Sequence, residues 1–153
     1  MRRLFYSDVQ SDRISLGLLL LRVVVGAAFM FHGLPKIKNP TDWMNRETTD
    51  VHGSLQAAAA VSEFAGGALL ILGLFTRVAA TATGVTMAVA VGIVHLSLRH
   101  PFVAQKPGEP SCELAAVYLA CSLLLVLAGA GRFSLDAVIF GRPRVVRDAS
   151  RPS

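Results

Sequence analysis

Residues 14–34, ISLGLLLLRVVVGAAFMFHGL, form an apolar run that contains one charged residue, Arg22, and a histidine, His32, near its far end. A helix rises about 1.5 Å per residue, so about twenty residues cross a hydrocarbon core of about 30 Å. An unpaired charge near the middle of a bilayer costs at least about 2.5 kcal/mol. The run therefore predicts a membrane-spanning helix whose arginine needs a partner elsewhere in the chain.

The composition favours one small integral membrane domain. Of the 153 residues, 53% are hydrophobic and only 16% are charged, which is fewer charges than a soluble domain carries. The net charge of +5 comes from basic residues at the ends of apolar segments, where they set topology and face lipid headgroups, so no nucleic-acid partner is expected. The two cysteines, Cys112 and Cys121, match neither a CxxC redox pair nor a zinc motif, and we predict no metal site.

The order of apolar and polar segments predicts an all-α fold, an integral membrane four-helix bundle with short interfacial helices. The predicted spans cover about residues 14–34, 54–75, 77–98 and 111–130, and a short interfacial helix covers about 134–140. Gly33 and Pro35 are expected to close the first span. Residues 1–13 are predicted to be a cytoplasmic lead-in, residues 14–140 the membrane domain, and residues 141–153 a basic cytoplasmic tail. The polar loop of residues 35–53 is predicted to form a lid or an interfacial helix.

The distribution of basic residues predicts the orientation. Four spans place both termini on one side, and cytoplasmic segments carry the excess of Lys and Arg. The side with the termini has nine such residues and the loop side has five: Arg2, Arg3, Arg13, Arg77, Arg132, Arg142, Arg144, Arg147 and Arg151 against Lys36, Lys38, Arg46, Arg99 and Lys106. We therefore expect both termini in the cytoplasm and the two loops outside.

Helical spacing predicts which polar groups meet inside the bundle. Arg22 and Glu63 fall within about 5 Å of each other in depth, which predicts a structural ion pair between the first two spans. Small residues at helical spacing are expected where helices pack closely: Gly26, Gly33, Gly66, Gly67, Gly84 and Ala88. The same topology sends five polar residues to the outer half of the bundle: His32, Lys36, Glu63, His95 and Glu113.

This outer-half cluster has two interpretations. It can form a polar pocket for a quinone headgroup, which needs hydrogen-bond donors and a path for protons. It can also be structural, with its members paired to fix helix register. The sequence specifies no cofactor, a bound quinone is the candidate, and a bis-histidine haem between His32 and His95 is disfavoured.

Two strings of residues resemble the DoxX family of small four-helix membrane proteins. In the first span they follow the pattern RxxxGxxFxxHGxxK from Arg22 to Lys36, and in the second the pattern ExxGGxxLxxGLxTR from Glu63 to Arg77. Further matches are His95, Glu113, Gly129, Gly131, Ser134 and Asp136. The resemblance covers about residues 14–140 and implies a bacterial or archaeal inner-membrane protein linked with redox enzymes, either quinone-reducing or thiol-handling.

Three functions remain open at this point. The first is a subunit of a quinone-linked or thiol-linked redox complex with a pocket in the outer half, for which catalysis by this chain is undecided. The second is a non-catalytic accessory subunit of a larger respiratory-type membrane complex, and the third is a small solute channel or carrier. Membrane lipids and either protein partners or further copies of the chain are the expected partners.

Overall fold

The computed structural model describes residues 11–44, 51–96 and 98–141. In these residues the chain is all-α, without strands: it has α2 (Asp12–Lys38), α3 (Gly53–Leu72), α4 (Thr76–Val89), the π-helix η1 (Ala90–His95), α5 (Glu113–Ala128) and α6 (Leu135–Phe140). η1 directly continues α4. Most of the predicted lead-in, residues 1–10, and the predicted tail from residue 142 lie outside the described residues.

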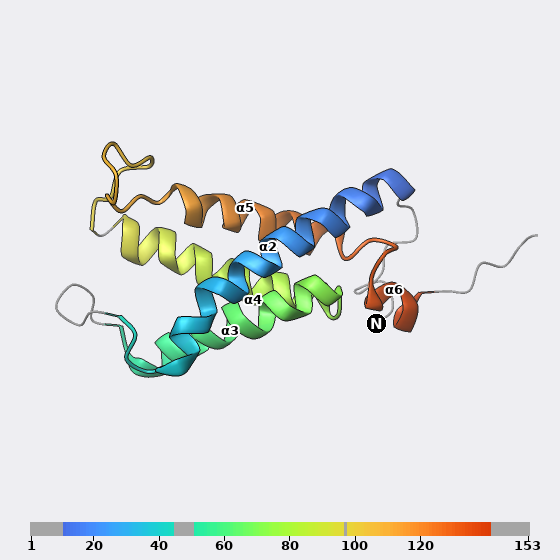
Figure 1. Cartoon of the computed structure of the whole chain (residues 1–153), viewed down its shortest axis with the longest axis horizontal. Coiled ribbons are helices and arrows are strands. Elements are labelled where there is room, and N and C mark those ends of the chain that lie inside the picture. The colour runs from blue at the N-terminus through green and yellow to red at the C-terminus, as the bar shows by residue number, and fades with distance from the viewer. Residues whose placement is uncertain (1–10, 45–50, 97, 142–153) are drawn as a thin grey trace, which may run out of the picture.

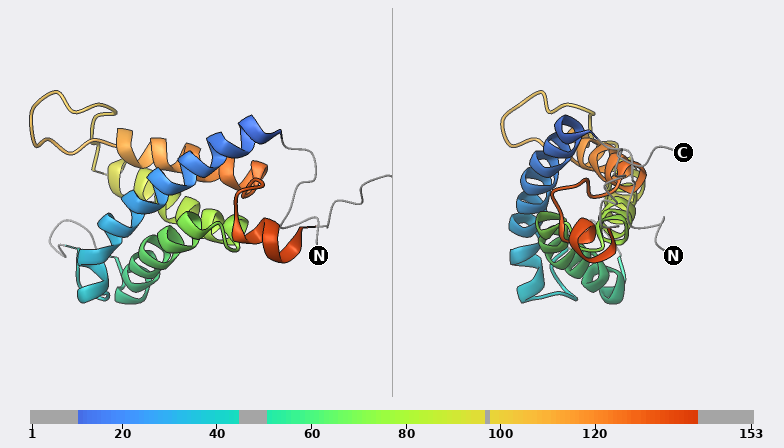
Figure 2. Two further views of the ribbon diagram at one scale, coloured as in Figure 1. Left: turned by 45° about the vertical axis from the view of Figure 1, so that its right-hand side comes forward. Right: turned by 90° about the vertical axis from the view of Figure 1, so that its right-hand side faces the viewer.

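The helices pack side by side in chain order. α2 packs on α3, α3 on α4 and α4 on α5, and α5 also touches α2 (Figure 1). One end of the molecule carries the described parts of the loops of residues 39–52 and 96–112, and we call it the loop end. The other end carries the turn between α3 and α4 together with α6, and we call it the turn end. Toward the loop end the pair α2–α3 diverges from the pair α4–α5 (Figures 1 and 2).

α2 is longer than the predicted span of residues 14–34. It begins after Ser11, whose side chain accepts a hydrogen bond from the backbone N–H of Ile14. It also continues through Pro35 and ends at Lys38, with Asn39 as its C-cap. A proline removes just its own N–H from the ladder of hydrogen bonds, and near the end of a helix one further turn can form beyond it. As a result Lys36 lies in the last turn of α2 rather than in a loop.

Glycines lie where neighbouring helices approach most closely. A Cβ atom on Gly67 would lie 2.6 Å from the carbonyl oxygen of Gly26, and one on Gly33 would lie 2.7 Å from the backbone nitrogen of Phe64. These contacts hold α2 against α3 at backbone distance. Gly66 faces Thr83 of α4, and Gly84 of α4 faces Ser122 of α5.

Ala88 does not belong to this set, contrary to the prediction. The buried face of α4 consists of Thr76, Ala79, Ala80, Thr83, Gly84 and Met87, and Ala88 is exposed. One residue along an α-helix turns the side chain by about 100°, so burial of Met87 places Ala88 on the outer surface.

Apolar side chains cover the outside of the molecule while many buried ones are polar. Arg22, Gln56, Glu63, Thr83 and Asp136 are all at most 2% exposed, whereas Phe31, Leu127 and Val138 are more than 75% exposed. A soluble domain has the opposite distribution of charges, and it seldom exposes a contiguous apolar surface of this extent. α2 and α3 are long and apolar enough to cross a membrane, and α5 is a shorter apolar helix.

Candidate functional site

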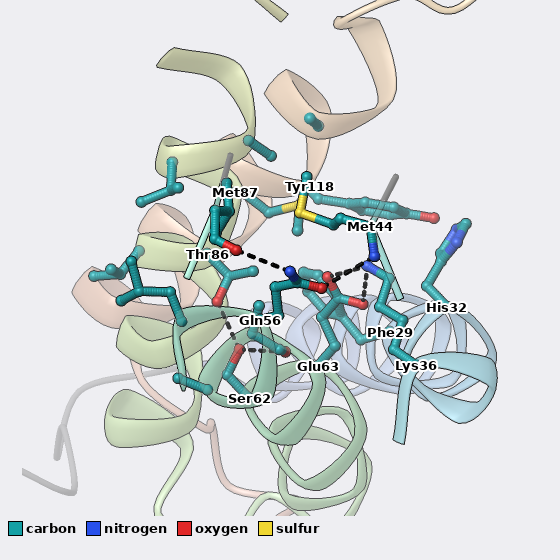
Figure 3. A pocket seen from close by; sticks show the side chains of 18 of the residues that line it. Phe29, His32, Lys36, Met44, Gln56, Ser62, Glu63, Thr86, Met87 and Tyr118 are labelled. Carbon is teal, nitrogen blue, oxygen red and sulfur yellow. Dashed lines mark hydrogen bonds and ion pairs between the residues drawn. The ribbon is translucent and has the colours of Figure 1, made fainter. Parts of the chain in front are cut away.

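A cavity of about 950 Å³ lies between the two diverging helix pairs, near the loop end (Figure 3). α2, α3, α4 and α5 each contribute to its walls, and the described parts of the loop of residues 39–52 line its top with Trp43, Met44, Val51 and His52. Its volume is at the upper end of the range of about 300–1,000 Å³ that small-molecule sites have. The lining side chains with polar or aromatic groups are Phe29, His32, Lys36, Trp43, His52, Gln56, Ser62, Glu63, Thr86, Ser111 and Tyr118.

A buried ion pair forms the polar centre of this cavity. The Lys36 ammonium lies 2.6 Å and 2.7 Å from the two carboxylate oxygens of Glu63. The side chain of Glu63 is 2% exposed and that of Lys36 is 23% exposed. The ammonium also lies 4.3 Å from the ring centroid of Trp43, within the distance of a cation–π contact. Because the ammonium has three N–H groups and the carboxylate takes two, Lys36 keeps one donor for a further partner.

The predicted ion pair between Arg22 and Glu63 does not form, since Glu63 pairs with Lys36. Arg22 instead donates to the carbonyl of Leu70, which lies seven residues beyond Glu63, or about 10 Å along α3. The prediction ended the first span at residue 34 and paired Arg22 with Glu63 from their estimated depths in the membrane. In the structure the extra turn of α2 brings Lys36 to the level of Glu63.

Gln56 fastens the loop over the cavity. Its side-chain oxygen accepts hydrogen bonds from the backbone N–H groups of Trp43 and Met44, both at 3.0 Å, and its amide nitrogen donates to the carbonyl of Val51 at 2.9 Å. The indole N–H of Trp43 donates to the backbone carbonyl of Gln56 at 3.0 Å. One buried side chain on α3 therefore binds both described ends of the loop.

The two lateral sides of the cavity differ. Between α2 and α5, the ring of Tyr118 packs against Phe29, with centroids 5.1 Å apart, and against His32, with centroids 6.0 Å apart. Between α3 and α4, the hydroxyls of Ser62 and Thr86 are 2.6 Å apart, and the lining residues nearer the loop end are aliphatic. Aromatic contacts thus cover part of the first side, where Leu114 of α5 also lines the cavity and is 50% exposed, and aliphatic side chains line the second.

The predicted outer-half cluster is brought together only in part. His32, Lys36 and Glu63 line the cavity. Glu113 is the first residue of α5; it is exposed and is not among the lining residues. His95 belongs to η1, and its side chain lies outside what the structure describes.

Sequence reasoning missed several lining residues. Gln56 shares the helical face of Glu63 at a spacing of seven residues, and this spacing could have identified it. The Ser62–Thr86 contact and the position of Tyr118 depend on which helices are neighbours. No local sequence pattern indicates which helices are neighbours.

A second polar cluster lies at the turn end, and we call it the clasp: Arg22, Gly73, Phe133, Ser134 and Asp136. Arg22, fully buried, donates to the backbone carbonyls of Leu70 and Phe133. Gly73 has φ 65°, and a Cβ atom there would collide with the Arg22 guanidinium and with Ser134. The α3–α4 turn therefore accepts only glycine at this position.

Asp136 completes the clasp by capping α4 from a distant part of the chain. Its carboxylate accepts hydrogen bonds from the backbone N–H groups of Phe75 at 2.7 Å and of Thr76 at 2.9 Å. It also interacts electrostatically with Arg22 and is 1% exposed. A carboxylate at a helix N-terminus satisfies free N–H groups and interacts favourably with the helix dipole. The acidic partner of Arg22 thus comes from α6 and not from α3, although α3 supplies the carbonyl of Leu70.

Both clusters use residues of the two strings that the sequence shares with one family. The profile of the DoxX family matches residues 17–96. The chain belongs to the DoxX family.

Two relatives extend the match beyond that segment. An uncharacterized protein of Haemophilus influenzae is 36% identical over 123 residues, which cover 80% of this chain and 90% of the relative. A Bacillus subtilis protein named "Putative oxidoreductase CatD" is 30% identical over 131 residues, which cover 82% of this chain and 88% of that protein. No solved structure is significantly similar to the chain.

The segment matched by the DoxX profile runs from α2 to the last turn of η1. It therefore includes Arg22 and the ion pair of Lys36 with Glu63. α5 and α6, which supply Tyr118 to the cavity and Asp136 to the clasp, follow it in the chain.

Proposed function

We propose that this DoxX protein crosses the cytoplasmic membrane of its cell four times, with both termini in the cytoplasm. Its apolar exterior, its two long apolar helices and the excess of basic residues on the side of the termini support this topology. In this arrangement the clasp lies near the cytoplasmic surface, and the cavity lies in the outer half of the membrane. Labelling single cysteines introduced at Asp12 and at Lys106 with an impermeant thiol reagent tests it, in a background where Cys112 and Cys121 are serine. Only Lys106→Cys should react in intact cells.

We infer further that the cavity binds the headgroup of a quinone and that the protein acts together with a redox enzyme. One observation carries this proposal: a lysine ammonium with a free donor is held by a buried carboxylate inside an otherwise largely apolar cavity. A quinone ring is apolar and flat, and it carries carbonyl oxygens that accept hydrogen bonds. The cavity offers the matching features, namely a charged donor at Lys36 and aromatic walls at Trp43 and Tyr118.

Glu63 has a specific role in this proposal. It neutralises the ammonium and fixes its position, so that the remaining N–H group can point at a carbonyl oxygen of the ring. It is also a proton-binding group next to that oxygen, as reduction of a quinone requires. The oxidoreductase name of the Bacillus subtilis relative is consistent with a redox context.

Quenching of Trp43 fluorescence tests the proposal directly. Trp43 is the only tryptophan of the chain and it lines the cavity, so a quinone bound there should quench its emission. The titration uses the purified protein in lipid nanodiscs and a methoxylated benzoquinone headgroup without a tail. We expect saturable quenching that Lys36→Met weakens at least tenfold.

Lys38→Met is the matched control, because Lys38 is exposed in the same last turn of α2 and does not line the cavity. This variant should bind like the parent. Quenching that rises linearly without saturation in the parent, or equal affinity of the two lysine variants, would refute a headgroup site at Lys36.

A further inference from the structure

We propose that the ligand of the cavity carries a long apolar tail and that this tail leaves the cavity between α3 and α4 into the bilayer. This inference rests on the proposed function, since it assigns the headgroup to the Lys36–Glu63 end. It adds the class of ligand, an amphiphile of the isoprenoid-quinone type, and the route by which such a ligand enters.

The distribution of polarity in the cavity carries the first step. Lys36, Glu63, Gln56 and Trp43 gather where α2, α3 and the loop meet. The opposite wall is aliphatic and comes from α3 and α4: Leu55, Ala58, Ala59, Ala82, Val85 and Val89. A single quinone ring at Lys36 would leave most of this wall without a contact and much of the cavity volume of about 950 Å³ unfilled. An apolar tail attached to the ring would fill that space.

The exposure of the aliphatic wall carries the second step. Leu55 is 63% exposed and Val89 is 44% exposed, although both line the cavity. Side chains that line a cavity and also face the outside mark the rim of its opening. In the proposed topology this rim faces lipid acyl chains, with which an apolar tail is miscible.

The contacts on the other sides carry the third step; there His32 of α2 and Leu114 of α5 also line the cavity and are exposed. Tyr118 packs on Phe29 and His32 between α2 and α5, and the loop is fastened by Gln56 above (Figure 3). Toward the turn end, the Ser62–Thr86 contact joins α3 to α4, and Gly66 then brings the two helices together at Thr83. On the loop-end side of Ser62, the gap between α3 and α4 has the larger aliphatic rim, with Leu55, Ala58 and Val89 exposed, and we assign the tail to it.

The experiment compares two quinones in the Trp43 quenching assay, the tail-less headgroup and the same headgroup with a decyl chain. Ala58→Phe places a ring at the rim, because Ala58 is exposed and lines the cavity. Ala65→Phe is the matched control: it lies two turns further on nearly the same face of α3, is exposed, and is away from the cavity. We expect Ala58→Phe to weaken the decyl quinone at least tenfold and the tail-less one less than twofold, and Ala65→Phe to change neither.

A photoreactive group at the end of the decyl chain supplies a second measurement that does not depend on a variant. Labelled peptides should come from α3 around Ala58 and from the end of α4 around Val89. Labelling confined to α2 and α5, or equal weakening of both quinones by Ala58→Phe, would overturn the route while leaving the headgroup site intact. Absence of saturable quenching by either quinone would instead refute the headgroup site, and the tail route with it.

Discussion

The clasp makes a quantitative prediction, since one carboxylate holds together segments that are 60 residues apart. Asp136→Asn keeps the shape of the side chain but removes its charge. One of the two acceptor oxygens becomes an NH2 group, which faces a backbone N–H of Phe75 or Thr76 and cannot accept from it. Hydrogen bonds to a charged group contribute about 1.5–3 kcal/mol each. Arg22, which is fully buried, also loses the negative charge opposite it.

Together these losses should lower the free energy of unfolding by about 3–5 kcal/mol, the range for breaking one side of a buried charge pair. The assay is a denaturation titration with sodium dodecyl sulfate in mixed micelles, followed by far-ultraviolet circular dichroism. Asp12→Asn is the control, because Asp12 pairs with Arg132 near the same end of the molecule but its side chain is 72% exposed. An exposed pair contributes at most about 1 kcal/mol.

Equal unfolding midpoints for Asp136→Asn and Asp12→Asn would refute the reasoning, because burial of the carboxylate is what separates the two cases. A second check is Asp136→Glu, which restores the charge but lengthens the side chain. If the negative charge near Arg22 matters, Asp136→Glu should recover part of the lost free energy of unfolding. If only the shape of the capping side chain matters, it should recover none.

Two further predictions concern the packing of α2 and the loop above the cavity. Gly26→Ala should cost about 1–3 kcal/mol, since its Cβ would lie 2.6 Å from the carbonyl oxygen of Gly67; Gly17→Ala on the same helix meets nothing within 4 Å and should stabilise slightly through helix propensity. A Gly26→Ala protein that unfolds at the same detergent fraction as the parent would contradict close packing at that crossing. Gln56→Leu should release the loop, shift the Trp43 emission to the red and increase its quenching by acrylamide, whereas Gln105→Leu in the second loop should change neither; an unshifted spectrum for Gln56→Leu would mean that Gln56 does not hold the loop.

Helical faces could be predicted from the sequence because they depend only on the period of the helix. The face of α3 with Gln56, Ala60, Glu63, Gly67 and Leu70 follows from spacing alone, and all five residues are buried. The cap of α6 by Ser134 is equally local. Features of this kind need no knowledge of which helix lies next to which.

Partners across helices could not be predicted, because they depend on register. A shift of one turn moves a helix by about 5 Å relative to its neighbour, and that is enough to exchange one ion-pair partner for another. The turn after Pro35 keeps Lys36 on α2 within reach of Glu63, whereas Arg22 lies about 10 Å away along α3, at Leu70. Asp136 was recognised as part of the family pattern, but its contact with the start of α4 crosses 60 residues of chain. The burial of Gln56 under the loop likewise depends on where the loop folds back.

The position of the Arg22 partner has a consequence for how the protein is made. Lys36 and Glu63 are 27 residues apart, so their pair can close as soon as α3 follows α2 out of the ribosome. Phe133, which accepts from Arg22, is 111 residues away, and at about 5–20 residues per second its synthesis takes roughly 6 to 22 seconds longer. Asp136 follows three residues later, so for that interval Arg22 of α2 has no acidic partner from α6. In the proposed topology, integration of α2 is therefore completed only with α6, and truncation before α6 should leave α2 poorly inserted.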